Sequence, residues 1–251
     1  GNIGIGSVAR ADPDGYTLLV TSSAFVLNPS LYANVPYDPF TDFAPISEMV
    51  ASPNVFLARP DLGVSSIKEL VALARKEPDK LNYGSPGVGT TPQLAAELLK
   101  VREKINMVQV QHAGAGPAVQ AILSGTVPVA CVALPPAQPH ILAGKLKALA
   151  VTSEKRASGL PDVPTMTELG YKDFVLDTMQ ALLAPAKTPP EIVERLAKLS
   201  VEILARPAVQ EKLKAGGFEV IGKGPDGLKA RIAREVPMMK EIVAQAGIKA
   251  K

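Results

Sequence analysis

The stretch of this sequence that most suggests chemistry is NYGSPGVGTTPQL at residues 82–94. It has the two glycines of a phosphate-binding loop, Gly84 and Gly89, but threonines follow where that motif requires lysine and then serine or threonine. A nucleoside triphosphate carries several negative charges and usually Mg²⁺, so a loop without the lysine matches it poorly. A carboxylate needs only a few donors, and the loop suits it better.

A strand over residues 81–84, then the glycine-rich turn, then a helix beginning near Thr91 or Pro92 would expose free backbone N–H groups at the positive helix end. Hydroxyl groups at Ser85, Thr90 and Thr91 would add further donors. This pattern predicts an anion site for a carboxylate. The alternative is that the glycines only make a tight turn and that Thr90 or Thr91 caps the helix.

The other reactive side chains give little support for catalysis. The chain has only two histidines and no G-x-S-x-G motif, which disfavours a hydrolytic triad. The single cysteine, Cys131, with two distant histidines gives no metal-ligand spacing. We therefore predict no catalytic residue, no metal site and no cofactor. His112 follows the expected strand at 106–110 and is either a ligand contact at the strand end or a packed side chain.

Composition narrows the class of protein. The chain has 251 residues, of which 47% are hydrophobic, enough for one large or two modest domains. Its net charge is only +3 and its basic residues are scattered, which argues against a nucleic-acid surface. Apolar runs are broken by prolines and fall well short of the ~18 residues of a membrane helix. The segment after Gly1 lacks the composition of a targeting peptide, so composition leaves the compartment open.

Short β-rich runs alternate with amphipathic segments, which predicts an α/β protein with mainly parallel strands. The expected strands are 16–20, 54–58, 81–84, 106–110, 127–133 and 146–152. The expected helices are 66–76, 93–100, 118–124 and 227–247.

One pattern occurs twice along the chain, in the order strand, proline-bearing loop and capped helix. Ser66 and Glu69 have capping-box spacing in the first copy, and Thr188 and Glu191 have it in the second. A chain that crosses to a second lobe and returns needs two such strand exits, which would place that lobe at about 58–176. The alternative is a chance repetition, since strand, proline and helix often follow one another in α/β proteins.

Several blocks, in order along nearly the whole chain, resemble one family. They are GNIG, VARADPDGYTLLV, NPSLYANVPYDPFTDFAPIS, NYGSPGVGTTPQLAAELLK, AGAGPAVQAILSG and APAKTPPEIVERL. In these blocks the chain resembles the extracytoplasmic solute receptors of tripartite tricarboxylate transporters, the Bug family. The resemblance implies an α/β, two-lobed, type II periplasmic binding protein in which each lobe is a mixed sheet flanked by helices. Lobe 1 would comprise residues 1–57 and 177–251, and lobe 2 residues 58–176.

The resemblance also implies a function. Such a receptor is periplasmic, is not an enzyme, captures a small carboxylate (an organic acid or acidic amino acid) between its lobes, and delivers it to membrane permease subunits. Two alternatives stay open: an α/β enzyme acting on a small acidic or phosphorylated metabolite, and a homologue that binds no solute and serves as an interaction module. Family members carry a strand and helix upstream of Gly1, so we expect lobe 1 to lack these elements.

Carried over by position, the family's ligand contacts fall on both lobes. The small hydroxyl residues and glycine of the 82–94 loop would serve lobe 2, and two serines after the first strand would serve lobe 1. The chain departs from the family where a tyrosine is common, at His112, and where an aromatic pair after serine or threonine is common, since Met179 and Gln180 follow Thr178 here. The predicted ligand-binding residues are therefore Ser22, Ser23, Ser85, Gly89, Thr90, Thr91, His112, Thr178 and Met179.

Overall fold

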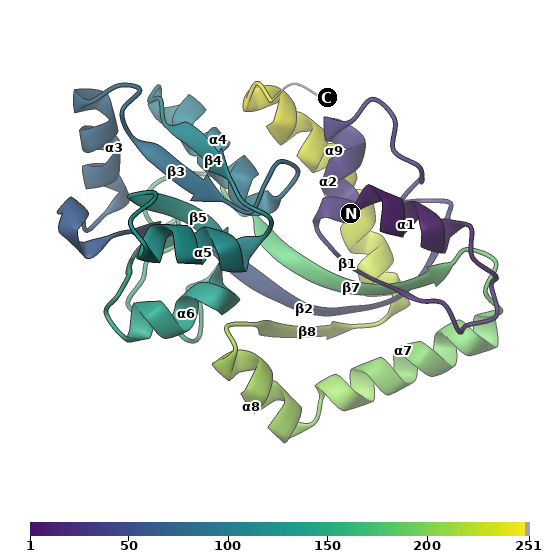
Figure 1. The fold of residues 1–251 in the computed structure, drawn as a ribbon. Coiled ribbons are helices and arrows are strands. Elements are labelled where there is room, and N and C mark those ends of the chain that lie inside the picture. Colours follow the sequence, from purple (N-terminus) through teal and green to yellow (C-terminus); the bar gives the residue numbers. More distant parts are fainter. Residues whose placement is uncertain (249–251) are drawn as a thin grey trace. The chain divides into compact units, whose positions relative to one another are not determined.

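The computed structural model describes residues 1–248. The chain divides into two compact units, each a sheet with helices packed against it (Figure 1). Unit 1 is formed by Gly1–Ala51, Met179–Lys214 and Glu219–Lys251, and unit 2 by Ser52–Thr178 and Ala215–Phe218. The chain enters unit 2 within one strand and leaves it within another, so both units are built from separated parts of the sequence.

Unit 2 contains most of the elements expected from the sequence. Its strands are the second half of β2 (Phe43–Ala58), β3 (Asn82–Ser85), β4 (Val108–Gln111), β5 (Val129–Ala133), β6 (Lys147–Val151) and the first residues of β7 (Asp177–Pro185). Its helices are the 3₁₀ helix η1 (Pro60–Leu62), α3 (Ile67–Lys76), α4 (Thr91–Glu103), α5 (Ala115–Leu123) and α6 (Leu134–Leu142).

The sheet of unit 2 has the order β6-β2-β5-β3-β4. Strand β3 is parallel to both β4 and β5, whereas β2 is antiparallel to β5 and β6. The expectation of mainly parallel strands is therefore correct for β3, β4 and β5 and wrong for β2. Helix and strand alternation identifies the segments, but it does not show that β2 enters the sheet in the opposite direction.

The N-terminal ends of α3 and α7 show whether the two expected capping boxes form. The Ser66 hydroxyl accepts a hydrogen bond from the Glu69 amide at 3.2 Å, as expected, while the Glu69 carboxylate accepts from the amide of Ser65. The second box is wrong. Helix α7 (Pro190–Leu204) has Pro189 as its N-cap and no side-chain cap, because a proline side chain has no oxygen that could accept from the amides of the first turn.

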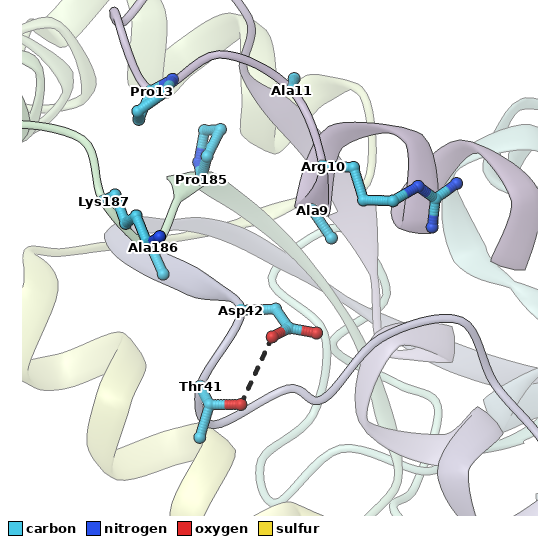
Figure 2. Close-up of a pocket in the computed structure, with 9 residues that line it drawn as sticks. All are labelled: Ala9, Arg10, Ala11, Pro13, Thr41, Asp42, Pro185, Ala186 and Lys187. Atoms are coloured by element: carbon cyan, nitrogen blue, oxygen red, sulfur yellow. Dashed lines mark hydrogen bonds between the residues drawn. The ribbon is translucent and has the colours of Figure 1, made fainter.

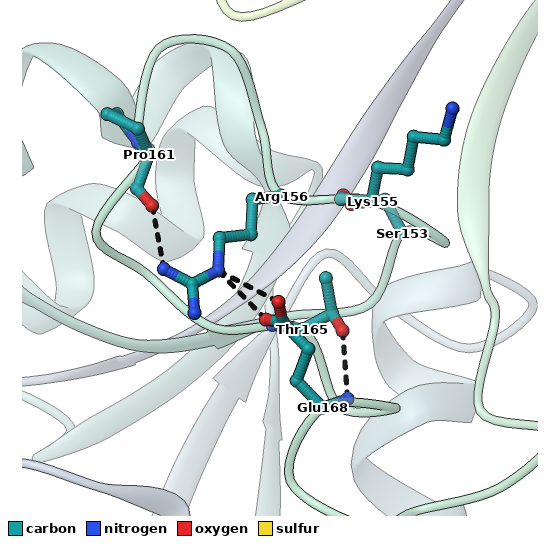
Figure 3. Close-up of polar contacts among 6 residues, drawn as sticks. All are labelled: Ser153, Lys155, Arg156, Pro161, Thr165 and Glu168. Atoms are coloured by element: carbon teal, nitrogen blue, oxygen red, sulfur yellow. Dashed lines mark hydrogen bonds and ion pairs between the residues drawn. The ribbon is translucent and has the colours of Figure 1, made fainter.

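A polar loop closes unit 2 after β6 (Figure 3). Thr165 and Glu168 exchange side-chain to backbone hydrogen bonds at 2.8 and 3.0 Å, and Arg156 donates from Nε to both Glu168 oxygens. The backbone bond from Thr165, followed by Arg156, lowers the pKa of Glu168. Thr165 forms a bridge with Val151, so this loop is tied to the end of β6.

Unit 1 has a sheet of order β1-β7-β2, with β8 paired to the first half of β2. Strand β1 is antiparallel to β7. Helix α2 packs against the long helix α9, and α7 packs against β8. The additional elements of unit 1 are α1 (Asn2–Ala9), β1 (Leu19–Ser22), α2 (Ala24–Leu31), α7, α8 (Pro207–Ala215), β8 (Glu219–Lys223) and α9 (Pro225–Gln245).

Three aromatic rings fill the core of unit 1 beside α2. Phe25 stacks on Tyr37 with ring centroids 5.4 Å apart and meets Phe43 edge to face at 5.2 Å. The Tyr37 hydroxyl donates to the Phe25 carbonyl at 2.9 Å, and burial raises the pKa of Tyr37. These contacts hold α2 against the start of β2, which fixes the position of the serines between β1 and α2.

A buried group of charges joins α9 to β2 in unit 1. The Arg231 guanidinium pairs with Glu48 and, through Nε at 2.8 Å, with Glu235. The side chains of all three residues are at most 7% exposed. Charges removed from water are stable only when they are paired, so Arg231 supports the Glu48 carboxylate and, together with Arg234, that of Glu235.

Candidate functional site

The loop between β3 and α4 takes a shape that requires glycine. Gly87 and Gly89 have φ of 124° and 81°, and both values lie in the region that side chains rarely adopt. A Cβ on Gly87 would also lie 3.3 Å from the His112 carbonyl oxygen. The loop then enters α4 at Thr91, with Thr90 in an extended conformation as the N-cap.

The loop and the first turn of α4 leave several backbone donors free. Among residues 1–248, the N–H groups of Val88, Gly89, Thr90, Thr91 and Gln93 have no hydrogen-bond partner. The first amide of α4 with a partner is that of Leu94, which bonds to the Thr90 carbonyl. Free amides at a helix N-terminus, where the helix dipole is positive, form a binding site for an anion.

The capping alternative fails for both threonines of this loop. The Thr90 hydroxyl donates to the Gly87 carbonyl at 2.8 Å instead of accepting from an amide of α4. The Thr91 hydroxyl lies 2.7 Å from that of Thr178, which in turn donates to Asn54 at 2.8 Å. Neither hydroxyl accepts a hydrogen bond from an amide of the first turn of α4.

Ser85 lies at the end of β3 and is fully buried. Its hydroxyl accepts from the Gln109 side chain at 2.7 Å, and its carbonyl accepts from the His112 amide. Ser85 therefore joins β3 to the end of β4 and supports the loop.

Two side chains near this loop keep a buried polar atom without a partner in the described part of the chain. His112 Nε2 is one, and it lies 3.5 Å from where a Cβ on Gly84 would be. Gln93 Oε1 is the other, on the first turn of α4. Sequence reasoning proposed His112 but missed Gln93, Asn54 and Gln109. The position of Gln93, two residues after Thr91, was the signal that could have included it.

The remaining predicted residues lie in unit 1. Ser22 ends β1, and its hydroxyl is 3.5 Å from the Ala24 amide. Ser23 is the N-cap residue of α2, and its hydroxyl accepts from the Met179 amide at 2.9 Å. The Met179 side chain is fully buried. Unit 1 therefore brings Ser22, Ser23 and Met179 to adjoining ends of β1 and β7, and unit 2 holds the other six residues.

Unit 1 also has a pocket of about 450 Å³ that contains none of the predicted residues (Figure 2). It is lined by residues 9–11 and Pro13, by Thr41 and Asp42, and by residues 185–187. The Asp42 carboxylate faces it and accepts from the Asp38 amide at 2.7 Å, while the Arg10 side chain extends away (Figure 2). Two basic residues, Arg10 and Lys187, line the pocket together with Asp42, and no residue of the loop between β3 and α4 takes part in it.

Metal-ligand clusters and membrane-spanning helices are both absent from the described residues. Across 1–248, no three histidine, cysteine or acidic side chains are grouped so that they could hold a metal ion. None of the helices in that range is both long enough and apolar enough to cross a membrane.

Comparison with known proteins then identifies the family. The family described as "Tripartite tricarboxylate transporter family receptor" matches residues 1–248. The chain belongs to this receptor family. The Bug-type resemblance and the α/β fold with mixed sheets flanked by helices, both expected from the sequence, are confirmed.

Three members of the receptor family show how far the similarity extends. Protein BugT of Bordetella pertussis is 33% identical over 253 residues, which cover 100% of this chain and 78% of BugT. The structure of R. palustris Rpa4515 with adipate has a TM-score of 0.94 at 30% identity, covering 100% of this chain and 84% of the other. MatC from Rhodopseudomonas palustris with bound malate has a TM-score of 0.86 at 29% identity, covering 96% and 84%.

Proposed function

We propose that this protein is a periplasmic receptor that captures a small carboxylate and delivers it to the membrane permease subunits of a tripartite tricarboxylate transporter. The observation that carries the proposal is the set of free amides from Val88 to Thr91 at the N-terminus of α4. Adipate and malate, the compounds present in two related structures, are both carboxylates.

The hydrogen bonds that the free amides can donate are comparable in free energy with the binding of such a ligand. A hydrogen bond to a charged group contributes about 1.5 to 3 kcal/mol, and micromolar affinity requires about 8 kcal/mol. Four such bonds sum to about 6 to 12 kcal/mol, a range that includes this amount, and contacts from unit 1 help to offset the free energy lost on association. A singly charged carboxylate also needs no lysine or Mg²⁺, which agrees with the sequence of the loop.

In the same proposal, Ser22 and Ser23 supply the contacts from unit 1, and the protein acts by binding without turnover. The side chain chemically best suited to act as a nucleophile is that of Cys131. It is fully buried, and burial raises the pKa of its thiol. A thiol held in its neutral form is a poor nucleophile. The enzyme alternative therefore has no observation in its favour.

Thermal unfolding with a panel of small mono- and dicarboxylates tests the proposal. At a concentration of about one hundred times Kd, a bound acid is expected to add ~2.7 kcal/mol and raise the Tm by roughly 5 to 10 °C. The matched control for each acid is its amide, which has the same carbon skeleton without the charge and should leave the Tm unchanged. The acid should be recovered intact. A panel in which no acid raises the Tm more than its amide would contradict the proposal.

A further inference from the structure

A chain of hydrogen bonds in unit 2 determines which way the hydroxyl protons point. It begins at Asn54, which is fully buried and whose Nδ2 donates to the Leu176 carbonyl at 2.8 Å. This bond fixes the orientation of the carboxamide, because the reverse orientation would place two acceptor oxygens against each other. The other carboxamide atom, Oδ1, is therefore an acceptor that faces Thr178.

The rest of the chain follows from the single proton of each hydroxyl. Thr178 lies 2.8 Å from Asn54 Oδ1 and must donate to it, because Oδ1 has no proton. Thr178 then has no proton left for Thr91, so the 2.7 Å contact between the two hydroxyls is donated by Thr91. Both hydroxyls can only accept a hydrogen bond from an incoming molecule.

Gln93, on the first turn of α4, carries a further buried acceptor. Its side chain is only 3% exposed, and its Oε1 is buried without a partner among the residues described. A buried acceptor left unpaired is destabilising, and a donor on a ligand would satisfy it.

We propose that the ligand carries a hydroxyl or amino group close to its carboxylate. This inference rests on the proposed function and narrows its ligand class to hydroxy acids and amino acids. The carboxylate binds the free amides of residues 88–91, and the neighbouring O–H or N–H donates to the hydroxyl oxygens of Thr91 and Thr178. An acid without such a donor would leave these acceptors unpaired.

Calorimetry with matched acids tests the inference directly. Succinate is compared with its 2-hydroxy and 2-amino derivatives, malate and aspartate, and glutarate with the corresponding pair. For the wild-type protein, at least one donor-bearing acid of a series should bind about tenfold more tightly than the unsubstituted acid, which corresponds to ~1.4 kcal/mol. The two derivatives also distinguish a hydroxyl from an ammonium donor.

Substitutions then show whether the preference depends on the acceptors. Thr91→Val removes the oxygen but keeps the shape and the amide, so the preference for the donor-bearing acid should fall to about twofold or less. Thr178→Val removes the other hydroxyl and frees the Thr91 proton, so the preference should fall in this variant as well. Thr91→Ser should retain the preference. Thr167→Val, at an exposed threonine of the same unit, should change nothing.

Three results overturn the inference, each in a recognisable way. Unsubstituted acids that bind the wild-type protein as tightly as their derivatives overturn the ligand class and leave the proposed function intact. A preference that survives in either valine variant overturns the role of the two hydroxyls, and Thr178→Val settles this if Thr91→Val does not fold. If no acid of either series binds, the proposed function fails and the inference fails with it.

Discussion

Replacing Arg231 with methionine is expected to lower the free energy of unfolding by about 3 to 5 kcal/mol. Methionine keeps much of the volume of the side chain but removes the cation that pairs with Glu48 and Glu235. Both carboxylates are almost completely buried and would be left without this partner. An unpaired buried charge is among the most destabilising changes a single substitution can make.

Urea unfolding at neutral pH measures this difference. The matched control is Arg234→Met, the same substitution on the same helix at a side chain that is 66% exposed and lies 3.4 Å from Glu235. It should lower the free energy of unfolding by no more than about 1 kcal/mol. Equal losses in the two variants would show that the pairing of Arg231 does not support unit 1.

Replacing Gly87 with alanine is expected to weaken carboxylate binding at least tenfold. The φ of 124° is unfavourable for any side chain, and the new Cβ would lie 3.3 Å from the His112 carbonyl oxygen. The strain of such a conformation is about 1 to 3 kcal/mol, and the loop can relieve it only by moving. Such a movement would displace the free amides of Val88 to Thr91, which follow Gly87 directly in the loop.

Gly63→Ala is the control for this substitution. Gly63 also has a positive φ, of 74°, and lies in unit 2, but a Cβ there meets no atom within 4 Å. It should therefore lose stability from backbone strain, by about 1 to 2 kcal/mol, without a change in affinity. Calorimetry that finds the same affinity in Gly87→Ala as in Gly63→Ala would show that the loop conformation is unimportant for binding.

The sequence predicted elements where local chemistry decides the structure. The strand before the glycine loop is found at β3, and Ser66 caps α3, because both depend on neighbouring residues. The first half of β2 was missed, since its buried Ser47 and Glu48 break the apolar pattern expected of a strand. Glu48 is buried there only because Arg231 of α9 pairs with it, at a distance of 183 residues along the chain.

In the candidate site, too, the sequence predicted the features that depend on neighbouring residues and missed those that depend on contacts far apart in the chain. The glycines and the helix start of the 82–94 loop indicate free amides, and the structure has them. The sequence also suggested that the Thr91 hydroxyl donates to the ligand, and the hydrogen-bond chain to Asn54 argues against this. That chain depends on a contact between Thr178 and Asn54, which are 124 residues apart, and no local pattern reveals its direction.

The central claim, that a carboxylate binds the amides before α4, is tested most directly by NMR. Amide ¹H and ¹⁵N shifts are followed while the best acid from the thermal panel is added. We expect the amide signals of Val88, Gly89, Thr90 and Thr91 to shift together and to saturate at the calorimetric Kd, while that of Lys68, near the start of the capped helix α3, does not move. Saturable binding that leaves those four amides unchanged would contradict it.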